Sequence, residues 1–144
     1  MTVSAQEAIE TVLIGRLRGA STLWGVRVQA ADIVGSGVVR PYVHYFPASD
    51  MQPASNPYHK RAELVYSIKG VAEDKATALA IREAITQLLD DSGDQDINPR
   101  LPYHAGWRVT TVSTDRAIWL QEYPAAGLTL WHAGHQYRIT MERR

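Results

Sequence analysis

Five histidines are the first side chains to test for chemistry, because the 144-residue chain contains no cysteine. Without cysteine, disulfides, thiolate metal sites and thiol nucleophiles are excluded. His132 and His135 form an H-x-x-H pattern, but two imidazoles fall short of the three or four ligands of a zinc site. No carboxylate stands at a matching spacing, and His44, His59 and His104 are scattered. We therefore interpret the H-x-x-H pair as solvated histidines of a turn and expect no bound metal.

Motifs for nucleophilic or phosphate chemistry are also missing from the sequence. No Gly-x-Ser-x-Gly nucleophile motif occurs. The segment Gly35-Ser36-Gly37 contains no basic residue and is not followed by a helical pattern, so it predicts a flexible turn rather than a phosphate-binding loop. We accordingly expect no catalytic residue, no cofactor and no enzymatic activity.

One cluster of acidic residues could have a specific role. Asp90, Asp91, Asp94 and Asp96 fall within seven residues. They lack the Asp-x-Asp-x-Asp-Gly spacing and the closing Glu of a calcium loop. A solvated helix end followed by a loop explains them, and the specific alternative is an acidic segment that faces a channel or a partner.

Composition limits the classes of protein further. The length suits a single domain spanning residues 1–144, and a domain of this size buries roughly 70% of the surface of its unfolded chain. Fifteen basic residues balance fifteen acidic ones, which argues against duplex nucleic acid as the main ligand. The first residues lack a basic segment followed by an apolar run, so we expect no signal peptide, and the sequence contains no apolar run of about 18 residues that could cross a membrane. Four tryptophans and seven tyrosines could anchor an interface, but most are expected in the core.

Two segments have the periodicity of amphipathic helices. The first follows a capping box formed by Ser4 and Glu7, and Gly19 is a plausible end. The second, Glu73–Leu89, keeps helical spacing of apolar or small residues for over three turns, and Gly93 marks its end. Three of its side chains are expected to be buried: Ile81, Ile85 and Leu88.

Alternating segments predict the strands of a sheet. They are Val26–Ala30, Val38–Phe46, Arg61–Val71, Trp107–Ser113, Ala117–Tyr123 and His135–Glu142. Pro41 cannot donate to a ladder, so the second of these strands should begin near Tyr42 or lie at an edge there. Residues 47–56 read as a loop, and residues 124–127 and 133–134 read as turns. The order of elements predicts an α+β fold, with a mixed or antiparallel sheet of about five strands packed against two amphipathic helices.

Several of these segments together resemble a known family. A short strand bearing an arginine, Val26–Val28, follows the first helix, and a Pro-Tyr-Val strand entry stands at Pro41–Val43. An Ala-rich helix runs through Leu79–Leu89, and the chain closes on the Tyr-Arg-Ile-Thr-Met-Glu strand Tyr137–Glu142. Over nearly its whole length, the chain resembles the tail terminator (tail completion) proteins of long-tailed bacteriophages.

The resemblance implies a structural protein of the virion, assembled in the host cytoplasm. Such proteins form a hexameric ring that caps the tail tube and presents a surface to the head-completion connector. The implied partners are therefore further copies of the chain, the tail tube protein and the connector protein, with genomic DNA only passing through the lumen and no membrane. The family has no catalytic residues to carry over.

Two other classes of protein stay open at this point. One is a different head–tail connector, such as a neck or head-completion protein, which a ring of twelve subunits would indicate. The other is a small enzyme or ligand-binding domain, which a deep apolar pocket with convergent polar groups would favour.

Overall fold

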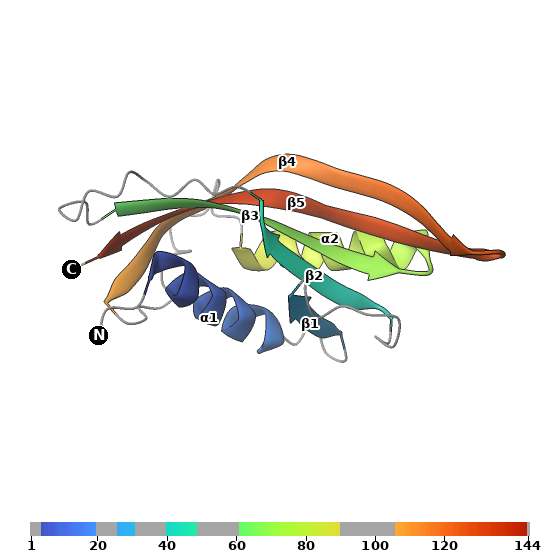
Figure 1. The fold of residues 1–144 in the computed structure, drawn as a ribbon, viewed down its shortest axis with the longest axis horizontal. Helices are drawn as coiled ribbons and strands as arrows, with labels where there is room; N and C mark the ends of the chain where they lie inside the picture. Colours follow the sequence, from blue (N-terminus) through green and yellow to red (C-terminus); the bar gives the residue numbers. More distant parts are fainter. Residues whose placement is uncertain (1–3, 20–25, 31–39, 49–60, 90–105, 144) are drawn as a thin grey trace.

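The computed structural model describes residues 4–19, 26–30, 40–48, 61–89 and 106–143, which form a mixed five-stranded sheet and two helices (Figure 1). The α+β class expected from the sequence is confirmed. In chain order the elements are α1 (Ala5–Arg18), β1 (Arg27–Ala30), β2 (Tyr42–Pro47), β3 (Arg61–Ala72), α2 (Lys75–Leu89), β4 (Trp107–Ala125) and β5 (Leu128–Arg143). Neither described helix has the length and apolar character needed to cross a membrane.

The first helix begins at the capping box that the sequence predicts. The backbone N–H of Glu7 donates to Oγ of Ser4 at 3.2 Å, and the backbone N–H of Ser4 donates to Oε2 of Glu7 at 3.2 Å. These bonds satisfy two donors that a helix start otherwise leaves unpaired. The helix turns one apolar face to the core, made of Ala8, Ile9, Val12, Leu13 and Leu17.

The sheet has the strand order β1-β2-β3-β5-β4, and both helices cover the same face (Figure 1). β1 and β2 are parallel, whereas the other neighbours are antiparallel. The longest unbroken pairing joins β3 to β5 over twelve residue pairs, from Arg61 opposite Glu142 to Ala72 opposite Trp131. Alternate residues of these two central strands therefore point to the helices. They include Ala62, Leu64, Tyr66, Ile68, Tyr137, Ile139 and Met141, all in the main core.

The second helix begins at Lys75 rather than at Glu73 as expected. The reason is the side chain of Asp74, which accepts hydrogen bonds from the backbone N–H of Thr77 at 3.0 Å and from its hydroxyl at 2.8 Å. Asp74 is thus the N-cap residue, and its two bonds lower the pKa of its carboxyl group.

The buried stripe of α2 is rotated slightly from the expected one. Ile81 and Ile85 are buried as expected, but Leu88 is only half-buried, and Leu89 is fully buried instead. The helix crosses β3 at Gly70, where an added Cβ would lie 2.5 Å from Cγ2 of Ile81. Glycine therefore allows the helix backbone to approach the sheet closely at this point.

The C-terminal hairpin differs most from the expectation. The two strands predicted at residues 107–113 and 117–123 are one strand, β4, which stays paired with β5 through three register shifts. The turn predicted at residues 133–134 is wrong, because both residues lie inside β5. An added Cβ on Gly134 would lie 2.2 Å from the carbonyl oxygen of Ile68, so this glycine permits close strand contact rather than a turn. The hairpin turns at Gly127, the last residue of the turn predicted at residues 124–127, and its φ of 77° suits glycine.

The second strand begins at Tyr42, directly after Pro41, as the sequence predicts. The loop predicted at residues 47–56 begins later, because Pro47 still pairs with Tyr66. Its residues from 49 onward, and residues 38–39 of the expected strand, lie outside the described part of the chain.

The burial of Ile85 predicts its contribution to stability. Ile85→Ala should lower the free energy of unfolding by roughly 2–5 kcal/mol, because it leaves a cavity between α2 and the sheet. Urea unfolding followed by circular dichroism measures this loss. The control is Glu83→Ala on the exposed face of α2, which should change stability by less than about 0.5 kcal/mol. Equal losses for the two variants would show that the buried face is assigned wrongly.

Candidate functional site

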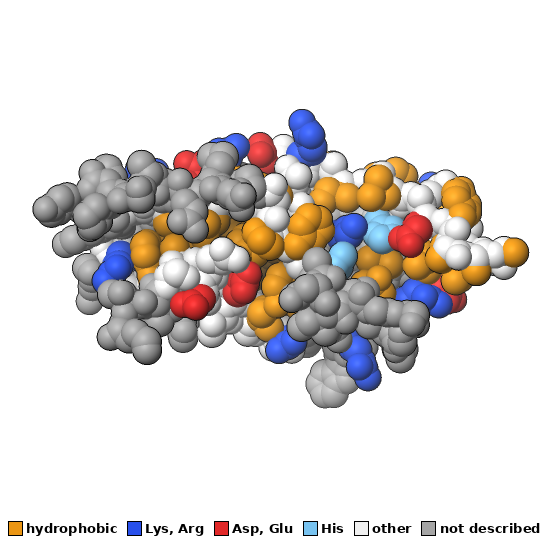
Figure 2. Space-filling model, viewed as in Figure 1, with side chains coloured by type: hydrophobic (Ala, Val, Ile, Leu, Met, Phe, Trp, Pro, Cys, Tyr) orange, Lys and Arg blue, Asp and Glu red, His pale blue; other side chains and the backbone are white. Residues whose placement is uncertain are grey.

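The sheet face opposite the helices carries a small polar cluster, formed by Lys69, Glu122 and His132. Lys69 lies on β3, His132 on β5 and Glu122 on β4, and the strand pairing brings them together. Val71 and Leu130 are among the buried apolar residues beside them. Figure 2 shows lysine, histidine and acidic side chains gathered among hydrophobic ones.

His132 is the most buried member of the cluster, with only 7% of its surface exposed. Its Nε2 lies 2.8 Å from Oε2 of Glu122, whereas its Nδ1 has no hydrogen-bond partner among the described residues. Burial, helped by the positive charge of Lys69, lowers the pKa of His132 even though Glu122 opposes the shift. The imidazole is therefore neutral at pH 7, and its Nε2–H donates to the carboxylate of Glu122.

Lys69 is buried to an extent that is unusual for a lysine, since only 9% of its surface is exposed. Burial lowers the pKa of its amine, and the nearby carboxylate of Glu122 partly offsets that shift. The amine also lies 5.8 Å from the centre of the Phe46 ring, within the range of a cation–π contact. The cluster thus holds one cation, one neutral imidazole and one carboxylate on a largely apolar surface.

The two histidines of the H-x-x-H pattern do not meet. Residues three apart on a strand point to opposite faces of the sheet, so His135 faces α2 while His132 faces away from it. Nδ1 of His135 lies 3.3 Å from Oγ1 of Thr86 on that helix, and its ring contacts Tyr137 edge to face. The expectation of solvated turn histidines is therefore wrong, and within the described ranges no three potential ligands converge on a metal position.

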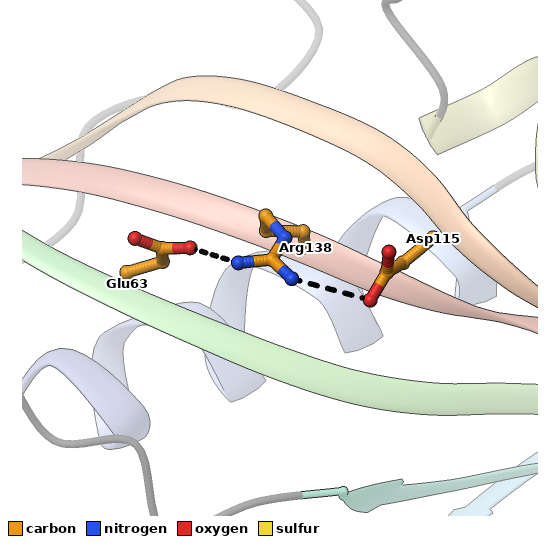
Figure 3. Close-up of polar contacts among 3 residues, drawn as sticks. All are labelled: Glu63, Asp115 and Arg138. Atoms are coloured by element: carbon orange, nitrogen blue, oxygen red, sulfur yellow. Dashed lines mark hydrogen bonds and ion pairs between the residues drawn. The ribbon is translucent and has the colours of Figure 1, made fainter.

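A second polar group on the sheet links its three C-terminal strands. The guanidinium of Arg138 on β5 donates to Glu63 of β3 and, at 3.3 Å, to Oδ2 of Asp115 of β4 (Figure 3). Hydrogen bonding to Glu63, followed by the charge of Asp115, raises the pKa of Arg138. Asp115 reaches this position because β4 shifts register between Thr114 and Arg116. Partly exposed ion pairs contribute little to stability, so their main effect is to favour one strand register.

The far part of the β4–β5 hairpin is the most exposed apolar surface of the described chain. Trp119 is 40% exposed, Leu120 52% and Tyr123 69%. The hairpin extends beyond the other strands, as Figure 1 shows. Trp119 packs against Trp131 at 5.2 Å between ring centres, and the amine of Lys75 lies 5.7 Å from both rings.

Sequence reasoning missed both of these surfaces for identifiable reasons. From the sequence alone most tryptophans and tyrosines are expected in the core, and His132 is expected in a turn. The signal for the exposed surface is the run from Ala117 to Leu120, whose four consecutive apolar residues place apolar side chains on both faces of the strand. No comparable signal marks the polar cluster, because its members come together only through strand register.

The acidic segment proposed from the sequence lies outside the described part of the chain. Asp90, Asp91, Asp94 and Asp96 lie outside the described residues, and so do His59 and His104. The lumen-facing role of the aspartates therefore stays a prediction.

Solved structures include chains with a similar fold. A chain from a solved structure described as the virion of a native gene transfer agent (GTA) particle superimposes with a TM-score of 0.68. The two chains share 20% sequence identity, and the match covers 96% of this chain and 99% of that one. This likeness shows a shared fold. A second solved chain, 12% identical over 96% of this chain and 92% of its own, has a TM-score of 0.49, which is too low to support a conclusion.

Sequence comparisons do not assign the chain to a family. No protein-family model matches the chain, and no curated protein matches it.

The lowered pKa of His132 predicts a pH-dependent stability. In the unfolded chain this histidine takes up a proton near pH 6.5, whereas in the fold it does so only at lower pH. Its contribution is therefore fully present above about pH 6.5 and is lost as the pH falls further. His132→Gln should flatten the dependence of unfolding free energy on pH between about pH 5 and pH 7, measured by urea unfolding.

The matched control for this measurement is Glu122→Gln. It removes the charge that opposes the shift, so the pKa of His132 should fall further and the pH dependence should steepen. If both variants kept the wild-type pH dependence, His132 would not be the titrating group.

The separation of the two histidines predicts that they hold no metal. Protein purified without a chelator should contain no stoichiometric zinc by elemental analysis, because His132 and His135 lie on opposite sheet faces. One zinc per chain, lost on His132→Ala, would contradict this placement.

Proposed function

We propose that this chain is a non-enzymatic structural protein of a phage-like virion, and specifically its tail terminator. The observation that carries the proposal is the fold match to a chain of a GTA virion over 96% of this chain and 99% of that one. The sequence resemblance to tail terminators is independent support, because it rests on residues and element order rather than on superposition.

In the proposed role, residues 1–144 form one domain, and copies of it close into a hexameric ring on the end of the tail tube. One surface of the ring binds the tail tube protein, and the other binds the head-completion connector protein. Genomic DNA passes through the lumen, and Asp90–Asp96 are the candidate lining, since repeated carboxylates repel phosphates. Assembly takes place in the host cytoplasm.

The described surfaces suit an assembly protein. A cyclic ring pairs two different surfaces of each subunit head to tail. The exposed end of the β4–β5 hairpin around Tyr123 is one candidate for such a surface, whereas the polar cluster at Lys69 and His132 is largely buried. Aromatic residues beside apolar and hydrogen-bonding groups are typical of interface cores.

The test is deletion of the gene from the phage or prophage, followed by electron microscopy. Loss of the terminator should give heads without attached tails, together with overlong or irregular tail tubes, because nothing stops tube elongation. Expression of the gene from a plasmid should restore joined particles. Tails of normal length joined to heads in the deletion strain would contradict the proposal.

Native mass spectrometry of the assembled ring separates the two structural roles. A six-subunit ring supports the terminator, whereas a twelve-subunit ring with affinity for a portal complex would favour a different head–tail connector.

A further inference from the structure

β4 forms one edge of the sheet, because among the described strands it pairs only with β5 (Figure 1). A regular stretch of this edge lies between two register shifts of β4. One shift falls between Thr114 and Arg116, and the other between Glu122 and Ala125. Within that stretch, Arg116–Glu122 keeps an uninterrupted register with β5. We call these seven residues the edge segment.

The edge segment lacks the features that usually protect sheet edges. Edge strands are commonly interrupted by bulges, prolines or charged side chains, since their unpaired N–H and C=O groups would otherwise pair with another strand. The five inner residues are Ala, Ile, Trp, Leu and Gln, without a charge or a proline. Trp119 and Leu120 are also among the most exposed large apolar side chains of the described chain. Such a strand is suited to pairing with a further strand.

The charges of the edge segment indicate which strand would fit. Arg116 and Glu122 stand three residues on either side of Trp119. In an antiparallel pair of two identical segments centred on Trp119, each Arg116 lies opposite the Glu122 of the other copy. Both charged contacts are then attractive, and opposite charges directly across a strand pair are stabilising.

The inner residues are complementary in the same arrangement. Ile118 lies opposite Leu120 on the helix-free face, where Leu120 also neighbours His132 of β5. On the other face Trp119 meets the Trp119 of the second copy, and cross-strand aromatic pairs stabilise sheets. A shift of register by two residues would lose both ion pairs.

We propose that the edge segment joins two free copies of this chain by antiparallel pairing about Trp119, giving a continuous ten-stranded sheet across a two-fold axis. The occupant of the edge is thus a second copy, bound through backbone hydrogen bonds and two Arg116–Glu122 ion pairs. The contact goes beyond the proposed function and stands apart from it, since ring contacts are head to tail whereas this one is two-fold. The two-fold contact covers the exposed edge of β4 until the chain joins a larger assembly.

Charge reversal tests this pairing in the full chain. Sedimentation analysis across a range of concentrations should show a dimer for the wild type. Arg116→Glu and Glu122→Arg should each place like charges opposite each other at both ends and weaken the dimer on the order of tenfold or more. The double variant R116E/E122R should restore the dimer, because it re-forms both ion pairs with exchanged partners.

The control variants reverse the charge of residues that lie outside the edge segment. Arg27→Glu on the opposite edge strand and Glu83→Arg on α2 should leave the dimer intact, and circular dichroism should show every variant folded. A wild type that is monomeric at all concentrations, or a double variant no tighter than the single ones, would overturn the proposal. Neither result affects the gene-deletion test, so this pairing and the terminator role can fail separately.

Discussion

The uninterrupted antiparallel pairing of β3 with β5 is the constraint on which the other surfaces of this protein depend. Twelve consecutive residue pairs fix which side chains face the helices and which face away. Tyr66 and Tyr137 lie opposite each other within the core, while Lys69 and His132 lie diagonally on the other face. Because side chains alternate along a strand, a slip of one residue would exchange these two sets.

Each helix is held against the central strands by a specific contact as well as by apolar burial. The hydroxyl of Tyr66 donates to Oε1 of Glu10 in α1 at 2.8 Å, and burial, followed by this bond, raises the pKa of that phenol. In α2, Ile81 packs directly on the backbone at Gly70, where a larger residue would push the helix away. The helix-covered face is thereby closed, and the far part of the β4–β5 hairpin is the most exposed apolar surface among the described residues.

Local signals explain which parts of the fold could be predicted from the sequence. The capping box at Ser4 and the apolar stripe through Ile85 act within a few turns, and both predict helices that the structure contains. The sequence predicts two strands where β4 is one, because the bulges of β4 break the alternation of apolar and polar residues. The local sequence at Gly134 predicts a turn, although this glycine contacts a strand that is distant in the sequence. The environment of His132 depends on strand register, which no local pattern specifies.

The proposed role of a ring-forming tail terminator places this protein between the tail tube and the head of its particle. In that role the central sheet gives each subunit a rigid frame, and the exposed end of the β4–β5 hairpin is a candidate contact surface. Cryo-electron microscopy of intact particles tests this account most directly, because the long bent sheet with two helices on one face is a recognisable shape (Figure 1). The account predicts six copies of this fold in a single layer at the junction of tube and head. Density for the fold elsewhere in the particle, or particles that lack it, would contradict the account.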